Sequence, residues 1–128
     1  MNLEILVSDM MRMNVLARLW HWTTDTAQHH LTYEQFLTQN ETFTDSLVES
    51  SLGNDLPLSF KQVGVKDALI DGYSLEKARE ELKNFRSRVT EFRGSLDSSD
   101  KPSSSELVTI LDSVIENASK TLYLLKLK

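Results

Sequence analysis

Residues 75–96, LEKAREELKNFRSRVTEFRGSL, decide the fold of this chain. Their apolar residues recur at alternating spacings of three and four, the repeat of a helix that packs against other helices along one seam. Ser74 stands before the first turn as an N-cap, and Gly94 with the polar segment after it is expected to end the helix. Pro102 then prevents continuation. The seam consists of Leu75, Ala78, Leu82, Phe85, Val89, Phe92 and Leu96.

The C-terminal segment repeats the same pattern. Ser103 and Glu106 have the spacing of a capping box, so we expect a second helix to begin at Ser103. Because the polar linker before it is short, these two helices should be antiparallel neighbours. The apolar seam of this helix consists of Leu107, Leu111, Val114, Ala118, Leu122 and Leu125.

The N-terminal half predicts two more helices that form an antiparallel hairpin. Apolar residues at helical spacing predict the first from about residue 3 to about residue 24. The second should begin after His30, where Thr32 and Gln35 have the spacing of a capping box, and should end at Gly53. Three large aromatic residues of this hairpin are expected in the core, as are the methionines of the first helix. The aromatic residues are Trp20, Trp22 and Phe36.

Residues 53–73 predict a long connection, because they hold three of the four glycines and one of the two prolines. We expect one short helical piece within it, at Lys66–Ile70. A connection of about 20 residues can travel the length of a bundle and lets two helices run parallel. The sequence therefore predicts an all-α four-helix bundle in which residues 1–128 form a single domain.

Charge and composition exclude several classes of function. The chain has no cysteine, which excludes disulfides, zinc–thiolate sites and thiol nucleophiles. The net charge of −5 disfavours nucleic acid and anionic membranes as partners. We expect the basic residues of 77–93 to form a solvated helix face with ion pairs inside that helix. With neither a secretory leader nor a run of about 18 apolar residues, the protein is expected in the cytoplasm.

The residues with metal-binding chemistry lie in the first two helices. His21, His29, His30, Asp45 and Glu49 offer nitrogen and carboxylate ligands of the kind that bind iron, manganese or zinc. Asp45 and Glu49, at spacing i, i+4, share one helix face. Asp45 lies ~20 Å along the helix from His30, so only two subunits packed antiparallel could unite these groups. The alternative is structural: histidines that cap a helix turn, and an acidic pair that faces solvent.

Other catalytic patterns are missing from the sequence. The last two helices contain no histidine, which excludes a carboxylate-bridged two-metal centre with Glu-x-x-His motifs inside one bundle. No GxGxxG motif, P-loop or nucleophile elbow is present.

Four short segments carry a resemblance to a known family: His21–Trp22–Thr23–Thr24, Gln28–His29–His30, Asp45–Ser46–Leu47–Val48–Glu49 and Thr121–Lys128. In this order they resemble the Dps-type mini-ferritins of the ferritin-like superfamily. They resemble even more closely a group of uncharacterised phage-encoded Dps-like proteins. The turn between the first two helices and the whole chain are shorter than in typical Dps proteins, and no basic tail for DNA binding is present.

The resemblance implies a ferritin-like bundle with a long connection between its second and third helices. It also implies an inter-subunit site for iron or another divalent metal, with ferroxidase or storage activity. His21 would be the first ligand and His30 the second, with His29 competing for that role. Asp45 and Glu49 of the partner subunit would supply the carboxylates. The protein would then be a homodimer or a larger homo-oligomer.

A second hypothesis assigns the protein no enzymatic activity. A phage-encoded bundle of this kind can act as an oligomeric interaction module that binds a virion component or a host protein, because members of a fold family often lose the chemistry while they keep the fold.

Overall fold

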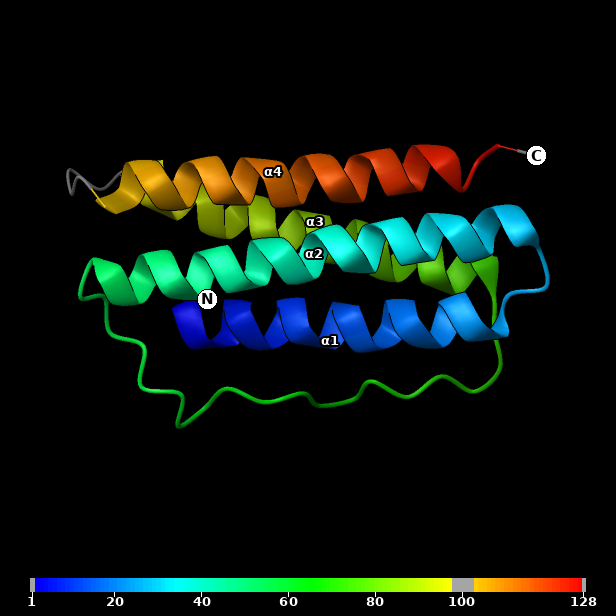
Figure 1. Cartoon of the computed structure of the whole chain (residues 1–128), viewed down its shortest axis with the longest axis horizontal. Coiled ribbons are helices and arrows are strands. Elements are labelled where there is room, and N and C mark those ends of the chain that lie inside the picture. The colour runs from blue at the N-terminus through cyan, green and yellow to red at the C-terminus, as the bar shows by residue number, and fades with distance from the viewer. Residues whose placement is uncertain (1, 98–102, 128) are drawn as a thin grey trace.

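The computed structural model describes residues 2–97 and 103–127, which form four helices. These are α1 (Leu3–Thr23), α2 (Ala27–Gly53), α3 (Leu75–Asp97) and α4 (Ser103–Leu124). Figure 1 shows that α1 and α2 run antiparallel, as do α3 and α4, whereas α2 and α3 run in the same direction. The described ranges contain no strand, and none of their helices is long and apolar enough to cross a membrane. Pro102 lies outside the described residues.

The core is one cluster of apolar side chains from all four helices. The predicted seam of α3 is confirmed: its five central residues, Ala78 to Phe92, are buried, while Leu75 and Leu96 pack partly buried at its two ends. All six predicted seam residues of the C-terminal segment are buried as well. Because each seam faces the other helices, burial of these side chains is the main favourable term in folding.

Residues 54–74 join α2 to α3 and run along α1, as Figure 1 shows. Hydrogen bonds hold the connection to α1. Among them, Ser59 donates to Glu4 (2.7 Å), Gly64 N–H to the Ser8 hydroxyl (3.0 Å), and Arg12 to the Asp67 carbonyl (3.2 Å). The helical piece predicted at Lys66–Ile70 is wrong. Asp67 has a φ of 55°, in the left-handed region, which a right-handed helix cannot contain.

The predicted start of the second helix is also wrong, because α2 begins four residues earlier, at Ala27. Its N-cap is Thr26, whose hydroxyl oxygen accepts a hydrogen bond from the His29 N–H (3.3 Å). Thr32 instead lies buried inside the helix and donates to the Gln28 carbonyl (2.9 Å). At the N-terminus of α3, by contrast, the predicted cap is confirmed, since Ser74 accepts from the Lys77 N–H (3.3 Å).

Three further expectations need correction. α3 continues through Gly94 to Asp97, because one glycine costs a helix only about 1 kcal/mol. Trp22 is 67% exposed rather than in the core, and the Arg18 guanidinium lies 5.9 Å from its ring centroid. Among the methionines, Met10 and Met13 are buried but Met11 is exposed.

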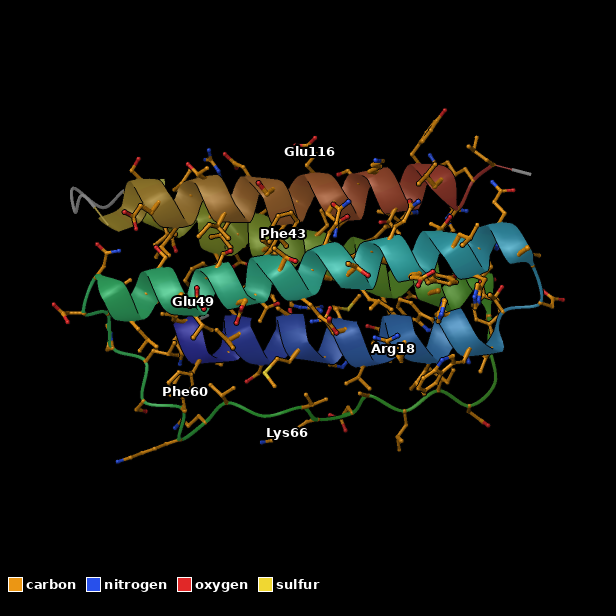
Figure 2. All side chains as sticks on the ribbon, viewed as in Figure 1. Arg18, Phe43, Glu49, Phe60, Lys66 and Glu116 are labelled. Carbon is orange, nitrogen blue, oxygen red and sulfur yellow. The ribbon has the colours of Figure 1, made fainter. Side chains whose placement is uncertain are left out.

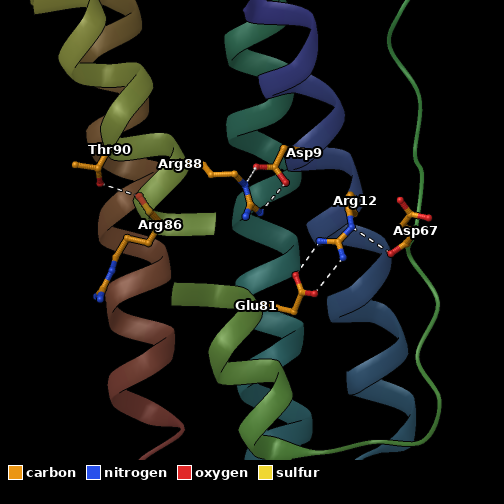
Figure 3. A network of polar contacts seen from close by, with 7 residues as sticks. All are labelled: Asp9, Arg12, Asp67, Glu81, Arg86, Arg88 and Thr90. Atoms are coloured by element: carbon orange, nitrogen blue, oxygen red, sulfur yellow. Dashed lines mark hydrogen bonds and ion pairs between the residues drawn. The ribbon is translucent and has the colours of Figure 1, made fainter. Parts of the chain in front are cut away.

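Two charged residues of α3, Arg88 and Glu81, pair with α1 rather than within α3 (Figure 3). Arg88 binds Asp9 of α1 with two hydrogen bonds (2.8 and 3.0 Å). Arg12 of α1 binds Glu81 in the same way (2.8 and 3.1 Å). The prediction of ion pairs inside this helix is therefore wrong for these residues: their charges hold α1 against α3.

Candidate metal centre

His21 and His30 meet where the α1–α2 hairpin turns. Their rings stack with centroids 3.7 Å apart and an angle of 21° between the ring planes. His21 is only 8% exposed and lies at the C-terminal end of the buried stripe of α1. His30 lies on the first turns of α2 and is exposed. The structure thus brings two of the predicted ligands together within one chain.

A reciprocal pair of hydrogen bonds fixes the two rings. Nδ1 of His21 lies 2.8 Å from the carbonyl oxygen of His30, and Nδ1 of His30 lies 2.7 Å from the carbonyl oxygen of His21. A carbonyl can only accept, so each Nδ1 must carry the proton. The neutral rings therefore present Nε2 as an unprotonated lone pair, which is the form that binds a metal.

Neither Nε2 has a hydrogen-bond partner among the described residues. Although the His21 residue is buried, its Nε2 atom is not one of the fully buried polar atoms that lack a partner. This nitrogen is therefore accessible from the surface. In metal sites a backbone carbonyl commonly accepts from the second ring nitrogen and orients the ligand. The histidine pair has this arrangement.

His29 does not belong to the pair. Its ring meets the edge of Tyr33, with centroids 6.5 Å apart. Burial, together with the hydrogen bond to Tyr73 (2.6 Å), raises the pKa of the Tyr33 hydroxyl above its ordinary value, so this neighbour stays neutral. Of the two histidines that competed for the second ligand position, His30 is the one beside His21.

Asp45 and Glu49 lie near the other end of α2, both exposed. Figure 2 shows Glu49 toward the opposite end of the α1–α2 pair from Arg18. Glu49 borders a shallow cavity of about 660 Å³ between α2 and α4, which Glu106 also lines. Hydrogen bonds from Ser50 and Asn54 lower the pKa of Glu106. Glu106 of α4 is thus a further carboxylate near Glu49. The spacing of residues along α2 could not predict it, because it lies on another helix.

The four predicted ligands do not meet within one chain. His30 and Asp45 are 15 positions apart on one continuous helix, which separates them by about 22 Å. Among the described residues, no group of three or more His, Asp or Glu side chains could hold a metal ion. Each chain therefore carries two separate groups of donors: the His21–His30 pair and the Asp45–Glu49 pair.

A second polar cluster lies between α1, α3 and the connection, around a cavity of about 330 Å³. Arg12 and Arg88 line it, and both are bound to carboxylates. The hydrogen bond from Arg12 lowers the pKa of Glu81 and raises that of Arg12 itself. Since both guanidinium groups are already bound, this cluster is structural. Its partners are 69 and 79 residues apart in sequence, too far for local patterns to predict them.

Comparisons of this chain with protein-family models, with curated proteins and with solved structures found no match. Functional inference therefore depends on the geometry of the two donor pairs.

Proposed function

We propose that the chain is a Dps-like mini-ferritin that binds a divalent metal, with Fe(II) as substrate, at a site shared by two subunits of a homo-oligomer in the cytoplasm. His21 and His30 of one subunit would face Asp45 and Glu49 of the partner subunit. The order of the helices and the connection of residues 54–74 are compatible with a ferritin-like bundle.

The observation that carries the proposal is the state of the two imidazoles. Both Nδ1 atoms are bound to backbone carbonyls, so the neutral form of each ring has its free lone pair on Nε2, and the ring orientation is fixed before any metal arrives. Two nitrogens with two carboxylates form a donor set that suits iron, manganese or zinc.

Each donor group has its own task. The carbonyls accept from Nδ1 of each imidazole, so the nitrogen left to bind a metal in either ring is Nε2. The carboxylates of Asp45 and Glu49 would neutralise the charge of the cation, and they are one helical turn apart, so both can reach one ion. Oxidation of Fe(II) to Fe(III) would release one electron per iron to dissolved dioxygen.

The test is metal binding to purified protein, measured by calorimetry with Zn(II) and by Fe(II) oxidation in air. We expect His30→Gln and the double variant Asp45→Asn/Glu49→Gln each to weaken binding at least about tenfold, because each removes ligands. His29→Gln is the matched control and should bind as the original protein does. Absence of metal binding by the original protein, or binding that survives the loss of both carboxylates, contradicts the proposal.

Mixing two defective variants tests whether the site is shared. His21→Gln/His30→Gln retains the carboxylates, and Asp45→Asn/Glu49→Gln retains the histidines. Unfolded together and refolded, they should form mixed dimers that have one intact site each. Binding restored in the mixture but in neither variant alone indicates a shared site, and no restoration argues against it.

A further inference from the structure

We propose that a cavity at one end of the bundle, between the starts of α2 and α3 and the end of α4, binds a small organic phosphate. Arg79, Lys126 and the first N–H groups of α2 would hold the phosphate group. None of the four predicted metal ligands lines this cavity, so the inference goes beyond the proposed function and is tested separately from it.

The cavity lies where three helix ends meet. Figure 1 shows the starts of α2 and α3 at the same end of the bundle as the end of α4. A hydrogen bond between the Tyr33 and Tyr73 hydroxyls (2.6 Å) joins α2 to the residues just before α3. The cavity has a volume of about 380 Å³. This volume is within the range of about 300–1,000 Å³ that is usual for small-molecule sites.

The charges around the cavity favour an anion. Among the described residues that line it, none is acidic, and the two that always carry charge, Arg79 and Lys126, are both basic. The whole chain, by contrast, has a net charge of −5. Two basic side chains that converge on one hollow of an acidic protein attract a negatively charged ligand there.

The guanidinium group of Arg79 is unpartnered in the described part of the chain. Its Nε atom is buried and makes no hydrogen bond. Arg79 also lines a neighbouring cavity with Glu76 and Glu80, but no ion pair joins it to either of them. Arg12 and Arg88, in contrast, are each bound to a carboxylate. Because a buried donor without a partner costs free energy, an anion toward which this group turns would supply the missing acceptor.

The start of α2 adds backbone donors. Thr26 accepts the His29 N–H with its hydroxyl (3.3 Å) and the His30 N–H with its carbonyl (3.0 Å). The N–H groups of Ala27 and Gln28 have no partner in the described ranges, and no acidic residue lies in the first turn of α2. Gln28 lines the cavity. Free N–H groups at a helix start bind anions, and here they adjoin the two basic side chains.

A phosphomonoester suits this lining better than a carboxylate. It carries a charge of about −1.5 to −2 at pH 7, which matches the two positive charges of Arg79 and Lys126. The guanidinium fork can donate to two phosphate oxygens at once. Leu75, Leu125 and Leu127 form the apolar part of the lining and would pack against the organic group. The ligand class is therefore a phosphomonoester with a small apolar group.

Acidic residues around the cavity disfavour nucleic acid as the source of the phosphate. Glu76 and Glu80 line the neighbouring cavity of about 370 Å³, and the exposed Asp25 precedes the N-cap Thr26. A polyanion would bring further phosphates close to these carboxylates, whereas one phosphomonoester needs the cavity alone.

The experiment titrates the full chain with phenyl phosphate by calorimetry, in buffer with EDTA so that no metal takes part. We expect one ligand per chain. Phenyl phosphate should bind more tightly than inorganic phosphate, because leucines contact its ring, and more tightly than benzoate, which has less charge.

Variants assign the binding to this cavity. Arg79→Gln should weaken phenyl phosphate binding at least about tenfold, because it removes a charged two-pronged donor. Lys126→Gln should weaken it by a smaller factor, because Lys126 is exposed. Lys83→Gln is the matched control: it removes the same charge one turn further along α3, outside the cavity, and should bind as the original protein does. Circular dichroism verifies that the variants fold.

Nuclear magnetic resonance locates the ligand on the original protein and does not depend on any variant. On addition of phenyl phosphate, the amide signals of Ala27, Gln28 and Leu127 should shift most. Those of Asp45 and Glu49, near the other end of α2, should stay in place. Shifts confined to another part of the chain contradict the proposal.

The remaining outcomes are equally decisive. No binding of phenyl phosphate at about 10 mM, or binding that survives both Arg79→Gln and Lys126→Gln, overturns the proposal. Equal affinity for inorganic phosphate overturns its organic part. Displacement of phenyl phosphate by a short single-stranded oligonucleotide overturns the small-molecule assignment. Arg79→Gln should bind Zn(II) as the original protein does. Phenyl phosphate binding in a protein that binds no metal keeps this inference and rejects the proposed function.

Discussion

The α1–α2 pair and the α3–α4 pair bury different kinds of side chain. Every buried residue of α3 is apolar, and its seam meets the apolar seam of α4. The α1–α2 pair buries four polar residues: His21, Thr32, Asn40 and Ser51. α4 buries two polar residues, Asn117 and Thr121, and Asn117 donates to the Phe36 carbonyl of α2 (3.2 Å). Most of the buried polar groups among the described residues thus lie on α2 or bind to it.

The difference separates two tasks. Apolar contacts stabilise the bundle but tolerate small changes in register. A buried hydrogen bond between particular atoms, such as that from Asn40 to Met10, favours one register because any other leaves a polar group unsatisfied. In the helix pair that holds the candidate ligands, buried hydrogen bonds therefore help to specify the relative position of the two helices.

The largest effect should come from the apolar pair. Phe85 is completely buried, and its ring meets Phe36 edge to face with centroids 6.5 Å apart. Phe85→Ala should lower the free energy of unfolding by about 3–5 kcal/mol, measured by urea titration. Phe43→Ala, at a partly buried position of α2, is the control and should cost less. Equal costs would mean that α3 does not form the centre of the core.

A smaller effect is expected where the two pairs are joined, at Arg12 and Glu81. The hydrogen bond from Arg12 lowers the pKa of Glu81, so the stabilisation is complete above the ordinary glutamate pKa of 4.5. It is lost as the pH falls through the lower pKa of the folded state. Because the Arg12 and Glu81 side chains are 22% and 34% exposed, solvent screens the pair in part, and Glu81→Gln should cost about 1–2 kcal/mol at pH 7.

The measurement is urea unfolding of the original protein and Glu81→Gln at pH 7 and at about pH 3. The stability difference should shrink at the lower pH, as the Glu81 carboxylate of the original protein takes up a proton. Glu116→Gln, an exposed glutamate of α4, should show little difference at either pH. A difference that does not depend on pH would contradict a role for the carboxylate charge.

The smallest effect tests where α2 begins. Thr26→Ala removes the N-cap and should lower the free energy of unfolding by about 1 kcal/mol. Thr32→Val keeps the shape of a buried side chain while removing a hydroxyl bound to its own helix, and should change stability by about 0.5 kcal/mol or less. If Thr32→Val instead cost more stability than Thr26→Ala, Thr32 would be the N-cap of α2, as the capping-box pattern predicted.

The difference between the two helix pairs also explains which parts of the fold could be predicted from the sequence. The 3-4 repeats of residues 75–125 predicted the buried seams, because a regular apolar repeat has only one helix face to bury. The start of α2 was misplaced because Thr26 and Thr32 are both good caps in isolation. The structure distinguishes them, because Thr26 accepts from the His29 N–H while Thr32 lies buried inside the helix.

The candidate site was predictable by residue type and not by geometry. The spacing of His30, Asp45 and Glu49 along one helix already predicted that one chain could not unite them. It did not separate His29 from His30, since neighbours in a helix differ only in the direction they face. It also gave no sign of the Nδ1–carbonyl bonds, which depend on how closely two helix ends approach.

The reciprocal bonds between His21 and His30 have a consequence for the order of events after synthesis. Their partners are nine residues apart, and a loop of about ten residues closes in about 10–100 ns. The nitrogen ligands can therefore be oriented while the hairpin is forming, in a step that does not depend on protein concentration. The carboxylates of the proposed site arrive only by collision with another chain, so occupancy at low expression would be limited by encounter rather than by metal supply.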